Sequence, residues 1–86
     1  MDITVGRVVI SSAGHDSGRY MVVTGADGMF CYVADGKERK LDSPKKKNVK
    51  HVRATSGFLE LEGMTDKRLR RTLRALSPDC TLQESE

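Results

Sequence analysis

The sequence predicts a small, mainly β domain, in which five short strands form an antiparallel barrel or sandwich and one helix follows them. Three observations predict this fold. Runs rich in β-branched and apolar residues alternate with Gly- and Pro-containing turn signals every several residues. Leucines at helical spacing follow these runs. The chain has 86 residues, of which 37% are hydrophobic, and this length supports a single core.

The strands are separated by recognisable turn residues. Gly14 ends the first strand, and a Gly-Ala-Asp-Gly turn follows the second. Asp35-Gly36 is a dipeptide that favours a two-residue type I′ hairpin, so it predicts that the third and fourth strands pair through a tight turn. The fourth is mostly charged, as an edge strand should be, and Ser43-Pro44 ends it before a lysine-rich connector. We expect the five strands at residues 5–12, 19–24, 29–34, 37–41 and 49–54.

The pattern changes after the fifth strand. Polar and apolar residues alternate over residues 58–62, which is compatible with either a short strand or an extended packing segment. Thr65 can cap a helix whose leucines fall at i, i+4 and i+7, and Ser77-Pro78 ends it. These leucines are Leu69, Leu73 and Leu76. The organisation we expect is one domain with a barrel over 1–55, an extension with an amphipathic basic helix over 56–78, and a flexible acidic tail over 79–86.

The positive charge is concentrated in two blocks, although the net charge is only +3. Residues 37–53 carry eight Lys or Arg against two acidic residues, a balance of +6. Residues 64–76 carry five against one, a balance of +4, and the remaining segments are acidic. Such blocks are often only a solvated face, but two of them in one small domain favour a polyanionic partner.

Catalytic and metal-binding patterns are missing from the sequence. The segment Gly14-His15-Asp16-Ser17-Gly18 contains the residue types of a hydrolytic triad, but adjacent residues point apart and the serine is not central. His51 is the only other histidine, and Cys31 and Cys80 form no C-x-x-C pair. We therefore expect no enzyme, no metal and no cofactor, and a reduced Cys31 in the core.

Membrane association is also disfavoured. The longest apolar stretches are a few residues, far short of the roughly 20 that a spanning helix needs. The first residues include no cationic region, so no secretory signal is expected and the protein should be cytoplasmic. The leucine stripe of the helix is too narrow to serve a membrane surface once it covers the barrel.

The N-terminal half resembles the KOW motif. In that family an apolar strand leads into a loop of pattern G-x-x-x-G-[KR], and a second apolar strand follows. Here residues 6–11, then 13–20 with Gly14, Gly18 and Arg19, then Val22-Val23 have this order. With D-G-K-E-R-K at 35–40 and P-K-K-K-N-V-K-H at 44–51, the chain is similar to bacterial KOW-domain RNA-binding proteins. These are related to the eukaryotic and archaeal large-subunit ribosomal proteins numbered fourteen, six and twenty-seven in the "e" series.

The resemblance covers about residues 4–53 and implies an SH3-like barrel that binds structured RNA in a ribosomal or translational setting. Ser17 stands where the family loop often carries lysine, so we expect the main RNA contacts on the lysine-rich segment instead. Gly14 and Gly18 are expected in a turn with positive φ, which can also bring backbone N–H groups close to phosphate. The expected RNA contacts are Arg19, Lys37, Arg39, Lys40, Lys45, Lys46, Lys47, Lys50, His51 and Arg53.

Several alternatives remain open for these residues. Arg19 is either a strand residue or a phosphate ligand, and the lysines could instead protect an edge strand from aggregation. The helix arginines could pair with nearby acids or face water. The aromatic residues are expected mostly in the core, which favours recognition of backbone and shape over base stacking; they are Tyr20, Phe30, Tyr32 and Phe58. The second functional hypothesis is a barrel that binds ribosomal or transcription proteins, as the KOW domains of transcription elongation factors do.

Overall fold

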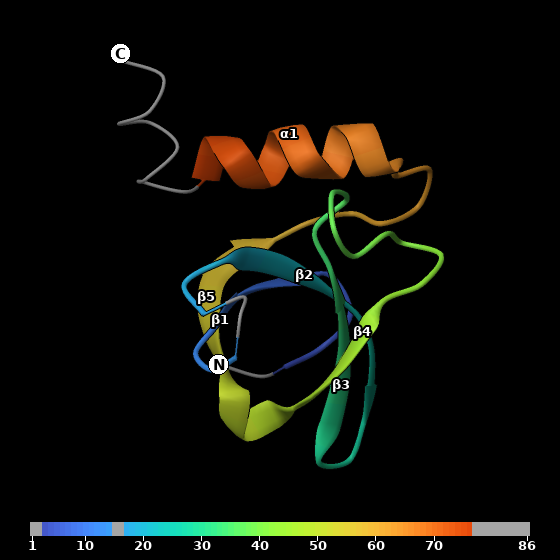
Figure 1. Ribbon diagram of the computed structural model, residues 1–86. Coiled ribbons are helices and arrows are strands. Elements are labelled where there is room, and N and C mark those ends of the chain that lie inside the picture. The colour runs from blue at the N-terminus through green and yellow to red at the C-terminus, as the bar shows by residue number, and fades with distance from the viewer. Residues whose placement is uncertain (1–2, 15–16, 77–86) are drawn as a thin grey trace.

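A computed structural model describes residues 3–14 and 17–76 of the chain. It confirms a mainly β protein with a five-stranded antiparallel sheet and one C-terminal helix (Figure 1). The strands lie side by side in the order β4-β3-β2-β1-β5. The elements are β1 (Arg7–Ser11), β2 (Tyr20–Asp27), β3 (Phe30–Ala34), β4 (Lys45–Asn48), the 3-10 helix η1 (Val49–His51), β5 (Val52–Phe58) and α1 (Asp66–Leu76).

The sheet curls around an interior, with β4 and β5 as its two edge strands (Figure 1). Within the described residues these edges are connected through η1 and do not pair with each other, so the sheet is not closed. The Ser12 N–H donates to the His51 carbonyl at 2.8 Å, which joins the end of β1 to η1. Figure 1 shows α1 lying over β2 on the outside of the curl, and η1 on the side away from α1.

Two apolar clusters lie on opposite faces of the sheet. The inner cluster fills the curl and consists of Val9, Met21, Val23, Cys31, Val33 and Val52. The outer cluster lies under α1 and consists of Val8, Val22, Ala34, Leu69 and Leu73. Consecutive residues of β1 and β2 therefore belong to different clusters, because successive side chains of a strand point to opposite faces. Cys31 is fully buried, as expected.

The fourth strand is displaced from its expected position. Residues 37–41 do not form a strand, and β4 instead occupies Lys45–Asn48 in the segment expected to be a connector. The tight hairpin is also absent. A type I′ turn needs positive φ at both central residues, but Gly36 has φ +78° while no described residue other than glycine has positive φ. Residues 35–44 form a longer loop between β3 and β4, which we call the β3–β4 loop.

The helix matches its sequence pattern in its first two turns. Thr65 Oγ1 accepts from the Arg68 N–H at 3.2 Å, which is the expected N-cap. Leu69 and Leu73 are buried, but Leu76 is 45% exposed, so the expected apolar stripe ends one turn early. The Ser77-Pro78 stop and the 79–86 tail lie outside the described residues. No helix within residues 3–14 and 17–76 is long and apolar enough to cross a membrane.

The segment after β5 packs as an extended chain. β5 itself continues past residue 55 to Phe58. Leu59 and Leu61 then pack against the outer cluster, and Met64 joins them before the helix begins. Of the two alternatives for residues 58–62, the structure shows the extended packing segment, with only Phe58 in a strand.

Candidate nucleic-acid interface

Two contacts fasten the β3–β4 loop to the first turns of α1. Arg70 Nη1 donates to the Gly36 carbonyl at 3.0 Å, and the Leu41 N–H donates to Asp66 Oδ1 at 2.8 Å. Gly36 is pressed so closely against α1 that a Cβ at this position would collide with the Asp66 carbonyl oxygen. The contacts bring residues 37–40, from the first basic block, beside the helix that carries the second basic block.

Asp35 organises the loop that these contacts hold. Its Oδ1 accepts from the N–H groups of Lys37 and Arg39, both at 2.9 Å, and its Oδ2 accepts from Arg19 Nη1 at 3.1 Å. Burial raises the pKa of the Asp35 carboxyl, but these donors stabilise its charge more strongly, so its pKa lies below the ordinary value. The chain bends here because the Lys37 and Arg39 N–H groups donate to a buried carboxylate. In a hairpin strand, such groups would instead donate to the carbonyl groups of the neighbouring strand.

Arg19 belongs to this network and is only 34% exposed at its side chain. Its Nη1 is 3.1 Å from Asp35 Oδ2 and 3.1 Å from Glu38 Oε2. The hydrogen bond to Asp35 raises the pKa of Arg19 above its ordinary value, against the opposing effect of burial. Arg19 is thus paired with two carboxylates, and it links the start of β2 to the β3–β4 loop.

Lys47 is the one member of the expected set that the structure buries, at 7% exposure. Its Nζ donates to the Ala13 carbonyl at 3.1 Å, so it joins β4 to the loop that follows β1. The Lys47 ammonium also faces Cys31, where burial raises the pKa of the thiol and the lysine charge opposes that rise. The Ala13 carbonyl also accepts from Ser11 Oγ at 3.1 Å, so the buried ammonium of Lys47 is part of the contacts that hold this loop.

The β1–β2 loop has the expected backbone geometry. Gly14 and Gly18 have φ of +86° and +87°, the left-handed region that glycine occupies without strain. The Gly18 N–H donates to the Ser11 carbonyl at 2.7 Å, so this N–H holds the loop rather than pointing outward. His15 and Asp16 lie outside the described residues.

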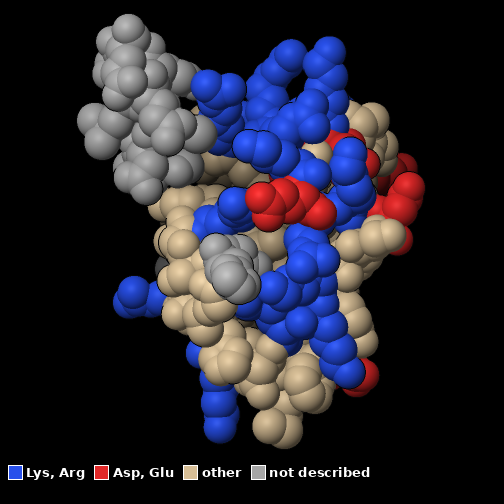
Figure 2. Space-filling view, in the orientation of Figure 1, with Lys and Arg blue, Asp and Glu red and all other residues tan. Residues whose placement is uncertain are grey.

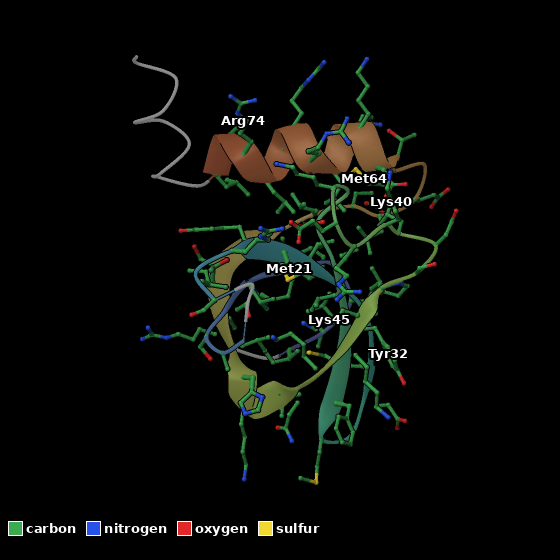
Figure 3. All side chains as sticks on the ribbon, in the orientation of Figure 1. Met21, Tyr32, Lys40, Lys45, Met64 and Arg74 are labelled. Carbon is green, nitrogen blue, oxygen red and sulfur yellow. The ribbon has the colours of Figure 1, made fainter. Side chains whose placement is uncertain are left out.

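Many of the other cations gather on the face that Figure 2 shows. Figure 2 shows Lys and Arg side chains gathered over α1 and continuing down across the β3–β4 side, with acidic side chains between them. In Figure 3, Lys40 lies close to α1, Lys45 lies further down on β4, and Arg74 projects from the outer side of the helix. We call this the basic surface. Its exposed cations are Lys37, Arg39, Lys40, Lys46, Lys67, Arg68, Arg70, Arg71 and Arg74.

The structure does not bring every expected residue to this surface. Lys50 and His51 lie in η1 and Arg53 lies in β5, and all three are exposed. Since η1 is on the side of the sheet away from α1, these residues form a separate group (Figure 1). The charge pattern of residues 37–53 could not reveal this division, because it depends on which way the chain turns after β4.

Two aromatic residues are on the surface rather than in the core. Phe30 is 37% exposed and Phe58 is 59% exposed, so their expected burial is wrong. Each ring has a cation above it: Lys46 Nζ is 4.3 Å from the Phe30 ring centroid, and the Arg7 guanidinium carbon is 5.5 Å from that of Phe58. The inner face of β3 is taken by Cys31 and Val33, which leaves Phe30 on the outer face.

The side chains of this surface are positively charged hydrogen-bond donors. No group of three or more His, Cys, Asp or Glu side chains that could hold a metal ion exists among the described residues. Exposed ammonium and guanidinium groups over a helix, a loop and a strand are suited to the oxygens of a polyanion. No family model matches the chain, and no curated protein sequence matches it.

Proposed function

We propose that the protein is a non-enzymatic RNA-binding module that contacts RNA phosphates through the basic surface. The observation that carries this proposal is the attachment of the β3–β4 loop to α1 by Arg70 and Asp66, which joins two basic blocks that are separate in the sequence. An array of cations on elements that are fastened together can follow a phosphate backbone. Two charge blocks that only kept the protein in solution would not need to be held together.

The resemblance to the KOW motif supports the same proposal. The positive φ of Gly14 and Gly18 agrees with the turn that the motif requires, and two apolar strands flank it. The curled five-stranded sheet, with η1 between its edge strands, is compatible with an SH3-like barrel, and we propose this as the finer description of the fold. The implied setting is ribosomal RNA or the translation machinery of the cytoplasm, with ribosomal or transcription proteins as further partners.

The proposed RNA contacts are fewer than the sequence indicates. Lys47 is buried and Arg19 is paired with two carboxylates, so both are left out. Lys50, His51 and Arg53 lie away from the basic surface and are left out as well. The proposed contacts are the exposed cations of the β3–β4 loop and β4, to which the structure adds those of α1. Because each phosphate that is neutralised releases counterions, the affinity should fall steeply with salt, with a log–log slope of about 0.7–0.9 per contact.

The test measures binding of ribosomal RNA by filter retention between about 50 and 200 mM salt. Two paired variants remove charge from the basic surface, namely Lys37→Gln/Lys40→Gln in the loop and Lys67→Gln/Arg71→Gln in the helix. A matched pair, Lys50→Gln/Arg53→Gln, removes the same charge from the η1 side. We expect each surface pair to lower the salt slope by about 1.4 to 1.8, since two phosphate contacts are lost, and the matched pair to leave it nearly unchanged.

Two results would overturn the proposal. If the wild-type protein does not retain ribosomal RNA at low salt and does not sediment with ribosomes, it is not an RNA-binding module of this kind. If the Lys50→Gln/Arg53→Gln pair lowers the slope as much as the other two pairs, the contacts are not concentrated on the basic surface. A loss of binding to an acidic protein in the surface variants, with RNA binding unchanged, would favour the protein-interaction alternative.

A further inference from the structure

The outer face of β3 and β4 carries two aromatic rings beside a lysine. Phe30 lies opposite Asn48, and Tyr32 lies opposite Lys46, in the antiparallel register of the two strands. Residues directly opposite each other in such a pair share a face of the sheet. Figure 3 shows Tyr32 on the outer side of β3, whereas Met21 points toward the interior.

The neighbouring strand leaves room for these rings. Gly25 of β2 lies opposite Tyr32, and a Cβ at Gly25 would be 3.4 Å from Tyr32 Cδ2. The Tyr32 ring therefore lies against the backbone of β2, at a position where β2 has no side chain. Tyr32 is half-buried in this position, so part of its side chain is open to solvent.

The charges around the rings are unequal. Lys46 Nζ lies 4.3 Å from the Phe30 ring centroid, at the border with the basic surface. Asp27, which lies opposite Phe30 on β2, is exposed and places a carboxylate on the other side. A phosphate is therefore attracted to the Lys46 side of the rings and repelled from the Asp27 side.

We propose that Phe30 and Tyr32 form a stacking surface for unpaired nucleotides of the bound RNA. This inference rests on the proposed function and adds to it the class of RNA, which is an unpaired segment beside the helical parts that the basic surface contacts. Every base has a π-face, so stacking on exposed aromatic rings tolerates any sequence. Stacking of a base contributes more binding free energy than an exposed cation–π contact does. A base therefore displaces the Lys46 ammonium from the Phe30 ring. The phosphate of that nucleotide then accepts a hydrogen bond from the released ammonium.

Tyrosine fluorescence gives a direct test, because the chain has no Trp and only two Tyr. In a Tyr20→Phe variant, Tyr32 is the only tyrosine, and Tyr20 itself packs against the outer cluster. We expect a short oligouridylate to quench Tyr32 emission in proportion to binding. An RNA duplex of the same length should bind without quenching, since its bases are already stacked. Equal emission changes with both probes would overturn the proposal.

A second test uses two matched phenylalanines. Phe30→Ala removes one ring of the proposed surface, and Phe58→Ala removes an exposed ring that also has a cation above it but belongs to β5. We expect Phe30→Ala to weaken oligouridylate binding by about 5- to 150-fold, the loss that corresponds to one stacked base. Phe58→Ala should change it less than about 2-fold, as an exposed position off the RNA path does.

The outcomes separate this inference from the proposed function. If the Lys and Arg variants weaken RNA binding but Phe30→Ala does not, the stacking surface is wrong and the basic surface stands. If Phe58→Ala weakens binding as much as Phe30→Ala, the effect is not specific to the outer face of β3. If neither probe binds the wild-type protein at low salt, the proposed function itself fails.

Discussion

The inner and outer apolar clusters differ in what they connect. The inner cluster joins β1, β2, β3 and β5 across the interior of the curl. The outer cluster joins the sheet to α1, with Leu69 and Leu73 packed on Val8, Val22 and Ala34. Leu41 of the β3–β4 loop also packs there, so this cluster fixes the loop and the helix together. The inner cluster forms the sheet, whereas the outer one positions the basic surface.

The difference explains the apolar runs at the start of the chain. Val8 and Val9 are both fully buried although they point to opposite faces, because each face of β1 is covered by a different cluster. The same holds for Met21, Val22 and Val23 in β2. In β3, by contrast, the exposed Phe30 is followed by the buried Cys31, because α1 does not cover that end of the sheet. In β1 and β2, the runs of consecutive buried residues therefore reflect burial on both faces of the sheet.

The largest expected effect comes from removing the helix side of the outer cluster. Leu69→Ala deletes a side chain with no exposed surface and leaves a cavity under α1. We expect the free energy of unfolding to fall by about 2–5 kcal/mol, measured by urea denaturation followed by circular dichroism. Leu76→Ala, on the same helix but 45% exposed, should change it by no more than about 0.5 kcal/mol. Equal losses in both variants would mean that α1 packs through its last turn as well.

Gly36→Ala tests the close approach between the β3–β4 loop and α1. The new Cβ would meet the Asp66 carbonyl oxygen, and the residue would be held at φ +78°. Gly28→Ala is the matched control, because Gly28 has φ +61° and nothing within 4 Å of the added Cβ. We expect about 1–2 kcal/mol of lost stability in the control from backbone strain, and about 1–3 kcal/mol more in Gly36→Ala from the collision. Similar losses would show that the loop can move away from the helix at little cost.

The sequence predicted the elements that depend on local pattern. The apolar runs predicted β1, β2 and β3, and Thr65 with the leucine spacing predicted α1, because these signals need no knowledge of distant contacts. The fourth strand was misplaced for a physical reason. The Asp35-Gly36 pair has the chemistry of a tight turn, but the Asp35 carboxylate instead accepts from the Lys37 and Arg39 N–H groups and pairs with Arg19, 16 positions away, so the chain forms a longer loop.

The candidate site was predictable in charge but not in geometry. The two basic blocks were visible in the sequence, yet nothing local indicates that Arg70 reaches Gly36 across 34 positions of the chain. Lys46 and Lys47 are neighbours with the same side chain, but one faces solvent and the other is buried against Ala13. Because side chains alternate in direction along a strand, a strand at β4 predicts that the two lysines point to opposite faces. Which of them points inward depends on the direction in which the sheet curls.

The smallest of these effects is expected at the Asp35 carboxylate. Asp35→Asn keeps an oxygen that can accept from Lys37 and Arg39 but loses the charge that faces Arg19. We expect a loss of about 1.5 kcal/mol at pH 7, the lower end of the range for hydrogen bonds to charged groups, because two of the three contacts survive. Urea denaturation of both proteins measures it.

The pH dependence of this loss identifies its cause. Because the pKa of Asp35 is below its ordinary value in the folded protein, the ionised carboxylate stabilises the fold at pH values above about 4, where the unfolded chain is also ionised. As the pH falls through the lower folded pKa, Asp35 takes up a proton and this stabilisation disappears. The stabilities of the wild type and Asp35→Asn should therefore differ by a constant amount between pH 5 and 7, and converge in acid. A difference that persists below the folded pKa would mean that Asp35 acts through its shape and not its charge.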